Sequence, residues 1–349
     1  MDSTAAGLLL KSAGYEVAGF HVRLHALSDR AWPQVKETAE EVGIPVQQVD
    51  LSREFADRIV TPFVEEYASG STPSPCPRCN RTIKLALLFE RVQLLGFDRI
   101  ATGHYARIAE GEDGPELLRG VDRKKDQSYF LALLTRDMLK RCLFPLGDYK
   151  KTAVRDLLKH RGISVWQSEE SQELCFVPGG NYRAFLREHG IEPRPGPITD
   201  VQGRVLGEHQ GITAYTVGQR RGLGVCGPEP YYVIRIDPRT NTVVIGTREE
   251  SLADIVRIRG INRLTPAPLG MGAQFQVKVR STARPAACAV IASSPDTVDL
   301  RLDMPQGGIA RGQVAVLYSG EKVVCGGWID SAWRTANPHS RGNDHDSIN

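Results

Sequence analysis

Helix-like and strand-like segments alternate along the first 165 residues, and this alternation restricts the fold more than any other feature of the chain. Apolar residues at helical spacing predict helices over residues 2–13, 31–42, 55–67 and 82–95. Short apolar runs predict strands over residues 15–22, 44–49 and 98–102. Strands that alternate with helices of this length form βαβ units, so we predict an α/β domain with a parallel sheet over residues 1–190.

The pattern changes after a proline-rich stretch at residues 193–197. Short β-like runs separated by turn residues follow, at 231–236, 242–245, 275–279, 288–291, 298–302, 314–318 and 323–329. We therefore predict a small central domain over residues 191–256 and a C-terminal β-barrel over residues 257–331. Residues 332–349 are polar and show no apolar periodicity, so we predict a disordered tail there.

The composition is that of a soluble globular protein. With 349 residues, 41% of them hydrophobic and 24% charged, the chain can form two or three domains. It has no apolar run of roughly 18 residues and no basic and apolar leader, so we expect a cytoplasmic protein outside the membrane. The net charge of +3 permits nucleic-acid binding without requiring it. The seven cysteines are mostly far apart, which indicates reduced thiols rather than a disulfide scaffold.

The segment from Thr72 to Lys84 is the most specific stretch of the sequence. It contains three prolines, followed by Cys79 and Asn80. We expect the prolines to exclude a helix and hold a rigid loop, with a helix starting at Asn80 as its N-cap. Cys79 would then lie at a helix N-terminus, where the helix dipole lowers the pKa of a thiol. This makes Cys79 a candidate reactive thiolate.

Cys76 and Cys79 form a C-x-x-C pair, which also allows half of a zinc site or a thioredoxin-like redox pair. A structural zinc site needs four ligands, usually from a second close pair. The sequence has no second C-x-x-C and no H-x-x-x-H pattern. We therefore predict no metal site, and the zinc site and the redox pair stay open as alternatives.

Two further segments contain candidate ligand-binding residues. Gly103 and His104 follow a predicted strand, at the edge of a parallel sheet where ligands bind, and Gly103 would let a nucleotide approach the backbone. His104 could contact a phosphate or a base, or be structural. Lys125 could meet a phosphate, and Asp126 could bind a metal or cap a helix. The simpler interpretation of this second segment is a solvated helix start.

Two segments give weaker signals. Cys175 lies in a loop before Gly179, and a lone cysteine is usually a small core residue. The turn at residues 215–224 is basic and rich in glycine, with a tyrosine at its start. Arginines beside an aromatic residue suit contacts with an RNA backbone and stacking on a base.

Taken together, five motifs in this order resemble the tRNA-specific 2-thiouridylases, which convert the wobble uridine of certain tRNAs to 2-thiouridine. The resemblance covers roughly residues 2–330. The motifs are P-x-P-x-x-x-C-N-x-x-I-K at 73–84, A-T-G-H-Y-A-R at 101–107, K-D-Q-S-Y-F-L at 125–131, S-Q-x-x-C-F at 171–176 and T-x-G-Q-R-x-G-L-G at 216–224.

The resemblance implies an architecture and a reaction. The expected architecture is a PP-loop catalytic domain of the adenine-nucleotide α-hydrolase-like, Rossmann-like class, then a central tRNA-binding domain and a β-barrel. The uracil O2 would attack the α-phosphate of ATP, expected with Mg²⁺, and sulfur would then displace AMP. Cys175 would carry this sulfur as a persulfide. Cys79 would act as the nucleophile that frees it, leaving a Cys79–Cys175 disulfide, or would assist as acid and base. A persulfide sulfur-donor protein and tRNA are the implied partners.

The resemblance also assigns binding residues. It assigns to ATP Asp2, Ser3, Val22 and Gly103. It places beside the target base Ser74, Pro75 and Cys76. It assigns to the rest of the tRNA His104, Lys125, Asp126, Gln127, Arg280, Ser281 and Gln313.

The sequence departs from the family pattern at three places. The family's phosphate loop reads S-G-G-x-D-S, whereas this sequence retains only Asp2 and Ser3, without the preceding strand and glycine pair. We therefore expect that the sequence is an N-terminally truncated form. Arg23-Leu24-His25 stands where the family often has acidic and cysteine residues, and Ser281 where it often has an aromatic residue.

Two other functions remain open at this point. A truncated ATP loop is compatible with a tRNA-binding protein that has no catalytic activity. A related PP-loop ligase that adenylates another substrate, such as an amino-acid carboxylate, would not need the paired cysteines. ATP–pyrophosphate exchange in the presence of tRNA distinguishes the enzyme from the binding protein.

Overall fold

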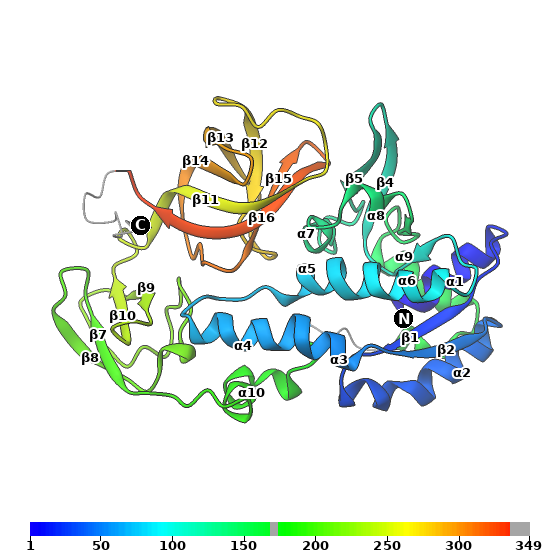
Figure 1. Cartoon of the computed structure of the whole chain (residues 1–349), viewed down its shortest axis with the longest axis horizontal. Coiled ribbons are helices and arrows are strands. Elements are labelled where there is room, and N and C mark those ends of the chain that lie inside the picture. Colours follow the sequence, from blue (N-terminus) through cyan, green and yellow to red (C-terminus); the bar gives the residue numbers. More distant parts are fainter. Residues whose placement is uncertain (168–173, 336–349) are drawn as a thin grey trace.

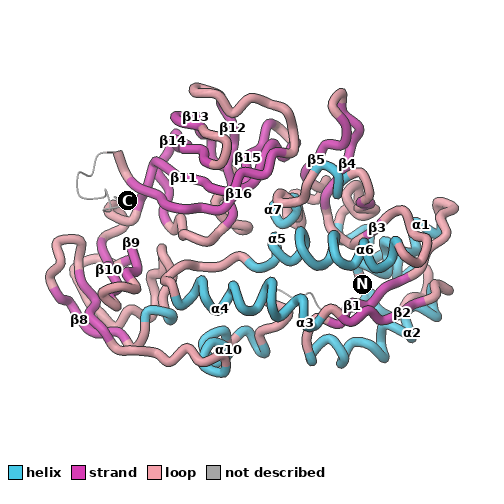
Figure 2. Tube along the Cα trace, in the orientation of Figure 1, coloured by secondary structure: helices cyan, strands magenta, loops and turns pink. Residues whose placement is uncertain are grey.

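The computed structural model of the chain describes residues 1–167 and 174–335 and shows an α/β part, a small central sheet and a β-barrel (Figure 1). Helices gather in the α/β part, and strands dominate the rest (Figure 2). The predicted order of an α/β domain, a central domain and a β-barrel is confirmed. Residues 171–173 of the S-Q-x-x-C-F motif and 336–349 of the predicted tail lie outside the described ranges.

The α/β part contains, in chain order, α1 (Asp2–Ser12), β1 (Gly19–Arg23), α2 (Trp32–Val42), β2 (Val46–Asp50), α3 (Ser52–Phe55), α4 (Thr61–Ala68), α5 (Pro75–Cys79), α6 (Leu88–Gln93), β3 (Ile100–Ala101), β4 (Ala106–Gly111), β5 (Gly114–Arg119), α7 (Ser128–Leu131), α8 (Arg136–Leu139), β6 (Cys142–Leu143), α9 (Lys151–His160) and α10 (Tyr182–Glu188). The remaining strands are β7 (Gly196–Thr199), β8 (Val205–His209), β9 (Tyr232–Asp237), β10 (Thr242–Gly246), β11 (Leu252–Arg263), β12 (Gln274–Lys278), β13 (Ala286–Ser293), β14 (Thr297–Gly307), β15 (Val314–Ser319) and β16 (Lys322–Trp333).

Parallel pairing in the α/β part is confirmed. Strand β1 pairs with β2, beginning with Gly19 opposite Val46, and β3 pairs with β6, beginning with Ile100 opposite Cys142. Among the described residues these are two separate two-stranded sheets, with no ladder between β1 and β3. The parallel strands therefore form two short sheets rather than the single sheet that we predicted.

The helix predicted over residues 55–67 is present, and the structure accommodates Pro62 without ending it. A π-helical turn (Ala56–Val60) lies between α3 and α4, and Pro62 falls in the first turn of α4. Proline has no backbone N–H to donate to the preceding turn. The π-helical turn changes the hydrogen-bond register just before Pro62, so that no donor is needed at this position. Helix α4 can therefore continue alongside the segment that carries Cys76 and Cys79 (Figure 1).

The C-terminal strands form a closed barrel. The order β11-β14-β13-β12-β15-β16 closes because β11 also pairs with β16, which gives six antiparallel strands. Its interior is a core of aliphatic side chains that includes Val256, Leu300 and Leu317. The central sheet has the order β8-β7-β10-β9, in which only β7 and β10 run parallel.

A hairpin of the α/β part extends the sheet of the barrel. The sequence patterns gave no indication of this hairpin, which consists of β4 and β5. Leu118 of β5 pairs with Lys322 of β16, and the Lys322 ammonium lies 2.9 Å from the Glu116 carboxylate. Backbone pairing and an ion pair therefore connect two parts of the chain that are about 200 residues apart.

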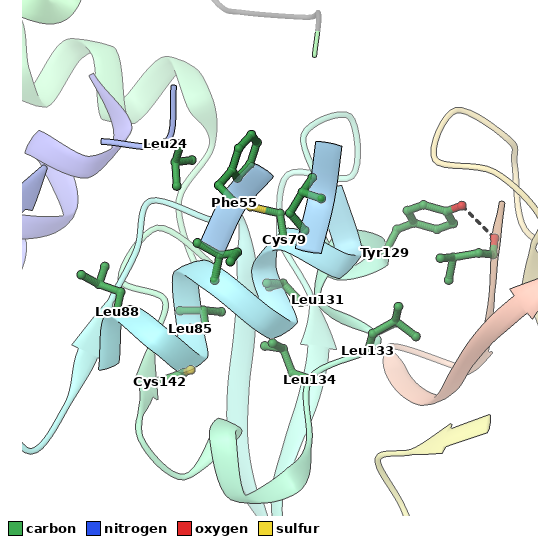
Figure 3. Close-up of a cluster of buried hydrophobic side chains, with 14 of the residues drawn as sticks. Leu24, Phe55, Cys79, Leu85, Leu88, Tyr129, Leu131, Leu133, Leu134 and Cys142 are labelled. Atoms are coloured by element: carbon green, nitrogen blue, oxygen red, sulfur yellow. Dashed lines mark hydrogen bonds between the residues drawn. The ribbon is translucent and has the colours of Figure 1, made fainter. Parts of the chain in front are cut away.

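Helix α7 is buried between the α/β part and the barrel. The Tyr129 hydroxyl donates a hydrogen bond of 2.7 Å to the Val314 carbonyl oxygen (Figure 3). The Asn262 side chain of β11 donates to the carbonyl oxygens of Ala132 and Leu134, at 2.9 and 2.7 Å. One continuous apolar core includes Tyr129 together with Val314 and other barrel residues. The barrel is thus attached to the α/β part by shared core and by hydrogen bonds.

We predict that Tyr129→Phe lowers the free energy of unfolding by about 0.5–1.5 kcal/mol, because it removes one buried hydrogen bond without changing the ring. Denaturant titration followed by fluorescence measures this change. Tyr149→Phe is the matched control, since Tyr149 is 37% exposed. Equal stability of the two variants would contradict the prediction.

Candidate active site

The cysteine segment is helical from Pro75 onward, so our prediction of a loop up to Asn80 is wrong. Ser74 is the residue before the first helical turn, and Pro75 occupies one of its first two positions. The first N–H groups of a helix have no partner inside the helix, so prolines are tolerated in this turn. Helix α5 continues through a π-helical segment (Asn80–Leu87) into α6.

Cys79 therefore lies one turn inside the helix rather than at its N-terminus. Its side chain is 5% exposed, and burial raises the pKa of the thiol to about 12. The predicted lowering of this pKa by the helix dipole is thus wrong for the protein without substrates. The position next to the helix start belongs to Cys76, which is exposed.

The structure brings the thiols of Cys76, Cys79 and Cys175 into one cluster, in which Cys175 is close enough to the other two to influence their ionisation. All three are free thiols. Cys76 and Cys175 are accessible to solvent but enclosed by the surrounding chain, and this desolvation raises the pKa of both. The predicted pair Cys79 and Cys175 therefore shares one site.

Lys84 is the cation of this cluster, and the sequence reasoning missed it as a site residue. Its positive charge opposes the effect of burial on the pKa of all three thiols. Lys84 lies on the same helix as Cys76 and Cys79, in its π-helical segment. The signal that could have identified it is the final lysine of the motif at residues 73–84.

His104 is joined to the cysteine helix through Asn80. The Asn80 side-chain nitrogen lies 3.4 Å from His104 Nε2 and donates at 3.0 Å to the Phe130 carbonyl oxygen. Burial, and secondarily the charge of Lys84, lower the pKa of His104 to about 3, so the imidazole is neutral. Because an amide nitrogen only donates, Nε2 accepts and Nδ1 carries the proton, which it donates to Thr102 Oγ1 at 2.7 Å.

Three of the four residues assigned to ATP meet at the start of α1. A Cβ atom added at Gly103 would lie 2.7 Å from Asp2 C and Cβ and 2.9 Å from Ser3 N, so only glycine fits there. This close approach places the A-T-G-H turn directly against the Asp2-Ser3 remnant. Val22, the fourth residue, lies on β1 opposite Val49.

Lys151 belongs to the same site and was also missed by sequence reasoning. Its ammonium lies 2.7 Å from both carboxylate oxygens of Asp2, and the Tyr105 hydroxyl donates to one of them at 3.1 Å. Lys151 is the first residue of α9, and its backbone N–H donates to Asp122. Lys151 and Asp2 therefore form a largely buried ion pair beside the N-terminus of α9.

Asp126 and Gln127 make internal hydrogen bonds. The Asp126 carboxylate accepts from the N–H groups of Gly120 and Ser128, both at 3.1 Å, which supports the capping interpretation. The Gln127 side-chain oxygen accepts from the Tyr105 N–H at 3.0 Å. The described residues contain no group of three or more His, Cys, Asp or Glu that could hold a metal ion.

The residues assigned to tRNA in the barrel lie at two places. Arg280 is exposed after β12, and its guanidinium approaches Gly308, where an added Cβ would lie 2.7 Å from it. Gly308 in turn touches Gly218 of the T-x-G-Q-R motif, where an added Cβ would lie 2.4 Å from Gly308 Cα. Gln313 instead contacts the segment that precedes α5, and Ser281 is half-buried beside Arg280.

Comparison with known proteins identifies the family. Residues 1–179 match the tRNA methyl transferase HUP domain, residues 183–247 the tRNA methyl transferase PRC-barrel domain and residues 254–329 the aminomethyltransferase beta-barrel domain. A tRNA-specific 2-thiouridylase MnmA of Syntrophotalea carbinolica is 41% identical over 337 residues, which cover 94% of this chain and 96% of the relative. The chain belongs to the tRNA-specific 2-thiouridylase family.

Other members of this family are similar over the same length. The 2-thiouridylases of Chloroflexus aurantiacus and Geobacter metallireducens are 40% and 39% identical, and each alignment covers 94% or more of this chain and 95% of the relative. The predicted family is thus confirmed. In the described part of the chain, every helix is too short or too polar to cross a membrane.

We predict that Lys84→Gln moves the alkylation of Cys76 and Cys175 by iodoacetamide to higher pH. The lysine charge favours the thiolates, so its loss raises the thiol pKa values and slows the reaction at any fixed pH. Peptide mass spectrometry of alkylation rates between pH 7 and 10 measures the shift, with Lys140→Gln as the control at an exposed ion pair. An unchanged pH profile in Lys84→Gln would contradict this role.

Proposed function

We propose that this protein catalyses the ATP-dependent 2-thiolation of the wobble uridine of tRNA. The observation that carries the proposal is the cluster of Cys76, Cys79 and Cys175 around Lys84, in a chain that matches a 2-thiouridylase over 94% of its length. The domain descriptions mention methyl transfer, but sulfur transfer is the chemistry that requires a sulfur carrier, and three clustered thiols supply one. We also propose a cytoplasmic location.

ATP is the expected activating substrate, with Mg²⁺. Transfer of its adenylate group to the uracil O2 lets this oxygen leave as part of AMP, which is a good leaving group. The described residues fit the phosphate part of ATP. The N-terminus of the 11-residue helix α1, the tight contact at Gly103 and the Lys151 ammonium, which is ion-paired with Asp2, lie together at one corner. We propose that Asp2, Ser3 and Gly103 bind ATP there, that Val22 contacts it and that Lys151 is a further ligand.

The sulfur step needs two thiols. The outer sulfur of a Cys175 persulfide would attack C2 of the adenylated base, and AMP would leave. Cys79 would then attack Cys175 Sγ, so that the S–S bond breaks, its electron pair stays on the sulfur now bound to C2, and a Cys79–Cys175 disulfide forms. A persulfide donor protein loads the sulfur, and a thiol reductant restores the two thiols.

The high pKa of Cys79 restricts its role. At neutral pH the resting thiol is protonated, so a nucleophilic Cys79 must lose its proton during the reaction. An acid role needs no such step, because a protonated thiol can donate its proton directly. We propose the nucleophilic role and retain the acid and base role as the alternative.

We propose that tRNA covers the cysteine cluster and reaches the barrel. Ser74, Pro75 and Cys76 would lie beside the target base at the first turn of α5. The remaining contacts would come from His104, Lys125, Asp126, Gln127, Arg280 and Ser281. We propose domain boundaries that give residues 1–190, 191–256 and 257–331, followed by the segment 332–349.

We predict that Cys79→Ser and Cys175→Ser each abolish thiolation, because neither serine can carry or accept the transferred sulfur. The readout is 2-thiouridine formed in purified tRNA, measured by nucleoside mass spectrometry, together with tRNA binding, which is expected to persist. Cys226→Ser is the control, since Cys226 is an exposed thiol outside the cluster. Wild-type thiolation by either variant would overturn the two-cysteine mechanism.

We predict that Gly103→Ala reduces ATP–pyrophosphate exchange at least tenfold, because its methyl group would displace the backbone of Asp2 and Ser3. Gly270→Ala is the matched control, since an added Cβ there meets nothing within 4 Å. Full exchange by Gly103→Ala would show that this corner does not bind ATP. The absence of exchange in the unmodified protein, with tRNA present, would contradict ATP-dependent activation itself.

A further inference from the structure

The barrel holds the segment that leads into the cysteine helix. This lead-in segment (residues 71–74) contacts the barrel loop (residues 310–313). The Thr72 N–H donates to the Arg311 carbonyl oxygen at 2.8 Å. In the opposite direction, the Gln313 side-chain nitrogen donates to the carbonyl oxygens of Thr72 and Pro73, at 3.0 and 3.2 Å. Each of the two segments, which are far apart in the sequence, thus donates hydrogen bonds to the other.

The barrel loop is itself held rigidly. The Gly312 N–H donates to Ile329 of β16, and the Ile329 N–H donates to Gln313. Gly312 has a φ of +88°, and an added Cβ would lie 3.0 Å from the Thr72 carbonyl oxygen. A side chain at this position would therefore be strained by the positive φ and would crowd the lead-in segment.

A second contact fixes the other end of the first turn of α5. The guanidinium of Arg78, between Cys76 and Cys79, stacks over the ring of Trp328 of β16 at 4.9 Å. Arg78 also forms an ion pair with Glu66 of α4. The turn that bears Cys76 is thus held before its start by Gln313 and after it by Trp328, and both belong to the barrel.

We infer that Gln313 is a positioning residue for the cysteine helix, which it holds through the backbone of residues 72 and 73. The side-chain nitrogen of Gln313 has two donor hydrogens, and these two carbonyl oxygens use both. A direct contact of Gln313 with tRNA through this nitrogen would break a hydrogen bond that sets the first turn of α5. The effect of Gln313 on thiolation rests on the proposed function, but its effect on the position of the cysteine helix can be tested without assuming that function.

Gln313→Glu tests the inference, because the ionised carboxylate has the same shape but cannot donate. Gln276→Glu is the control, with the same change of charge at an exposed position of β12. We expect amide hydrogen exchange of the peptide covering residues 70–80 to become about tenfold faster in Gln313→Glu and to stay unchanged in Gln276→Glu. In thiolation assays, Gln313→Glu should lower kcat more than it changes the KM for tRNA.

Unchanged exchange in Gln313→Glu, with weaker tRNA binding than in Gln276→Glu, would overturn the inference and make Gln313 a direct tRNA contact. Gln313→Met, which removes the donor without adding charge, gives the same comparison if the glutamate variant does not fold. The exchange measurement needs neither ATP nor tRNA. A protein that proved inactive in thiolation would therefore refute the proposed function while the role of Gln313 is decided separately.

Discussion

The burial of helix α7 between the α/β part and the barrel is the interaction on which the site depends. Its Phe130 carbonyl oxygen holds Asn80 of the cysteine helix, and its Tyr129 hydroxyl holds Val314 of the barrel. Asn80 in turn contacts His104, which follows Gly103. The turn of Gly103 and His104, the cysteine helix and the barrel are therefore connected through one buried turn of helix.

Desolvation raises the pKa of the three thiols, and this effect is larger than the opposing effect of the Lys84 charge. A pKa of about 12 for Cys79, against a usual value of 9.0, corresponds to about 4 kcal/mol against the thiolate. A helix N-terminus contributes only about 0.3–1 kcal/mol in its favour. The charge of Lys84 offsets part of the cost for all three thiols. In the protein without substrates, the Cys79 thiol is therefore protonated at neutral pH.

The sequence predicted helix ends and strands correctly where interactions between residues close in the chain determine them. The helix over residues 31–42 ends at Gly43, whose positive φ is the conformation that glycine adopts most easily, and the observed helix ends at Val42. The barrel strands were predicted near their observed positions, because short runs of apolar, largely buried residues between turns leave a clear pattern. The start of the cysteine helix was mispredicted, because prolines that break a helix interior are compatible with its first turn. The β4–β5 hairpin was missed, since its partner β16 lies about 200 residues away.

The sequence alone established the family, the order of the three parts and the residue types of the site, because motifs and periodicity are local properties that survive without coordinates. It named Cys79, Cys175, Gly103 and Asp2, but it could not show that Gly103 touches Asp2 or that the thiols share one cluster. Lys84 and Lys151 emerged only from the folded structure. Lys151 reaches Asp2, and Lys84 acts on the Cys175 thiol, only in the folded chain, because these partners are distant in the sequence.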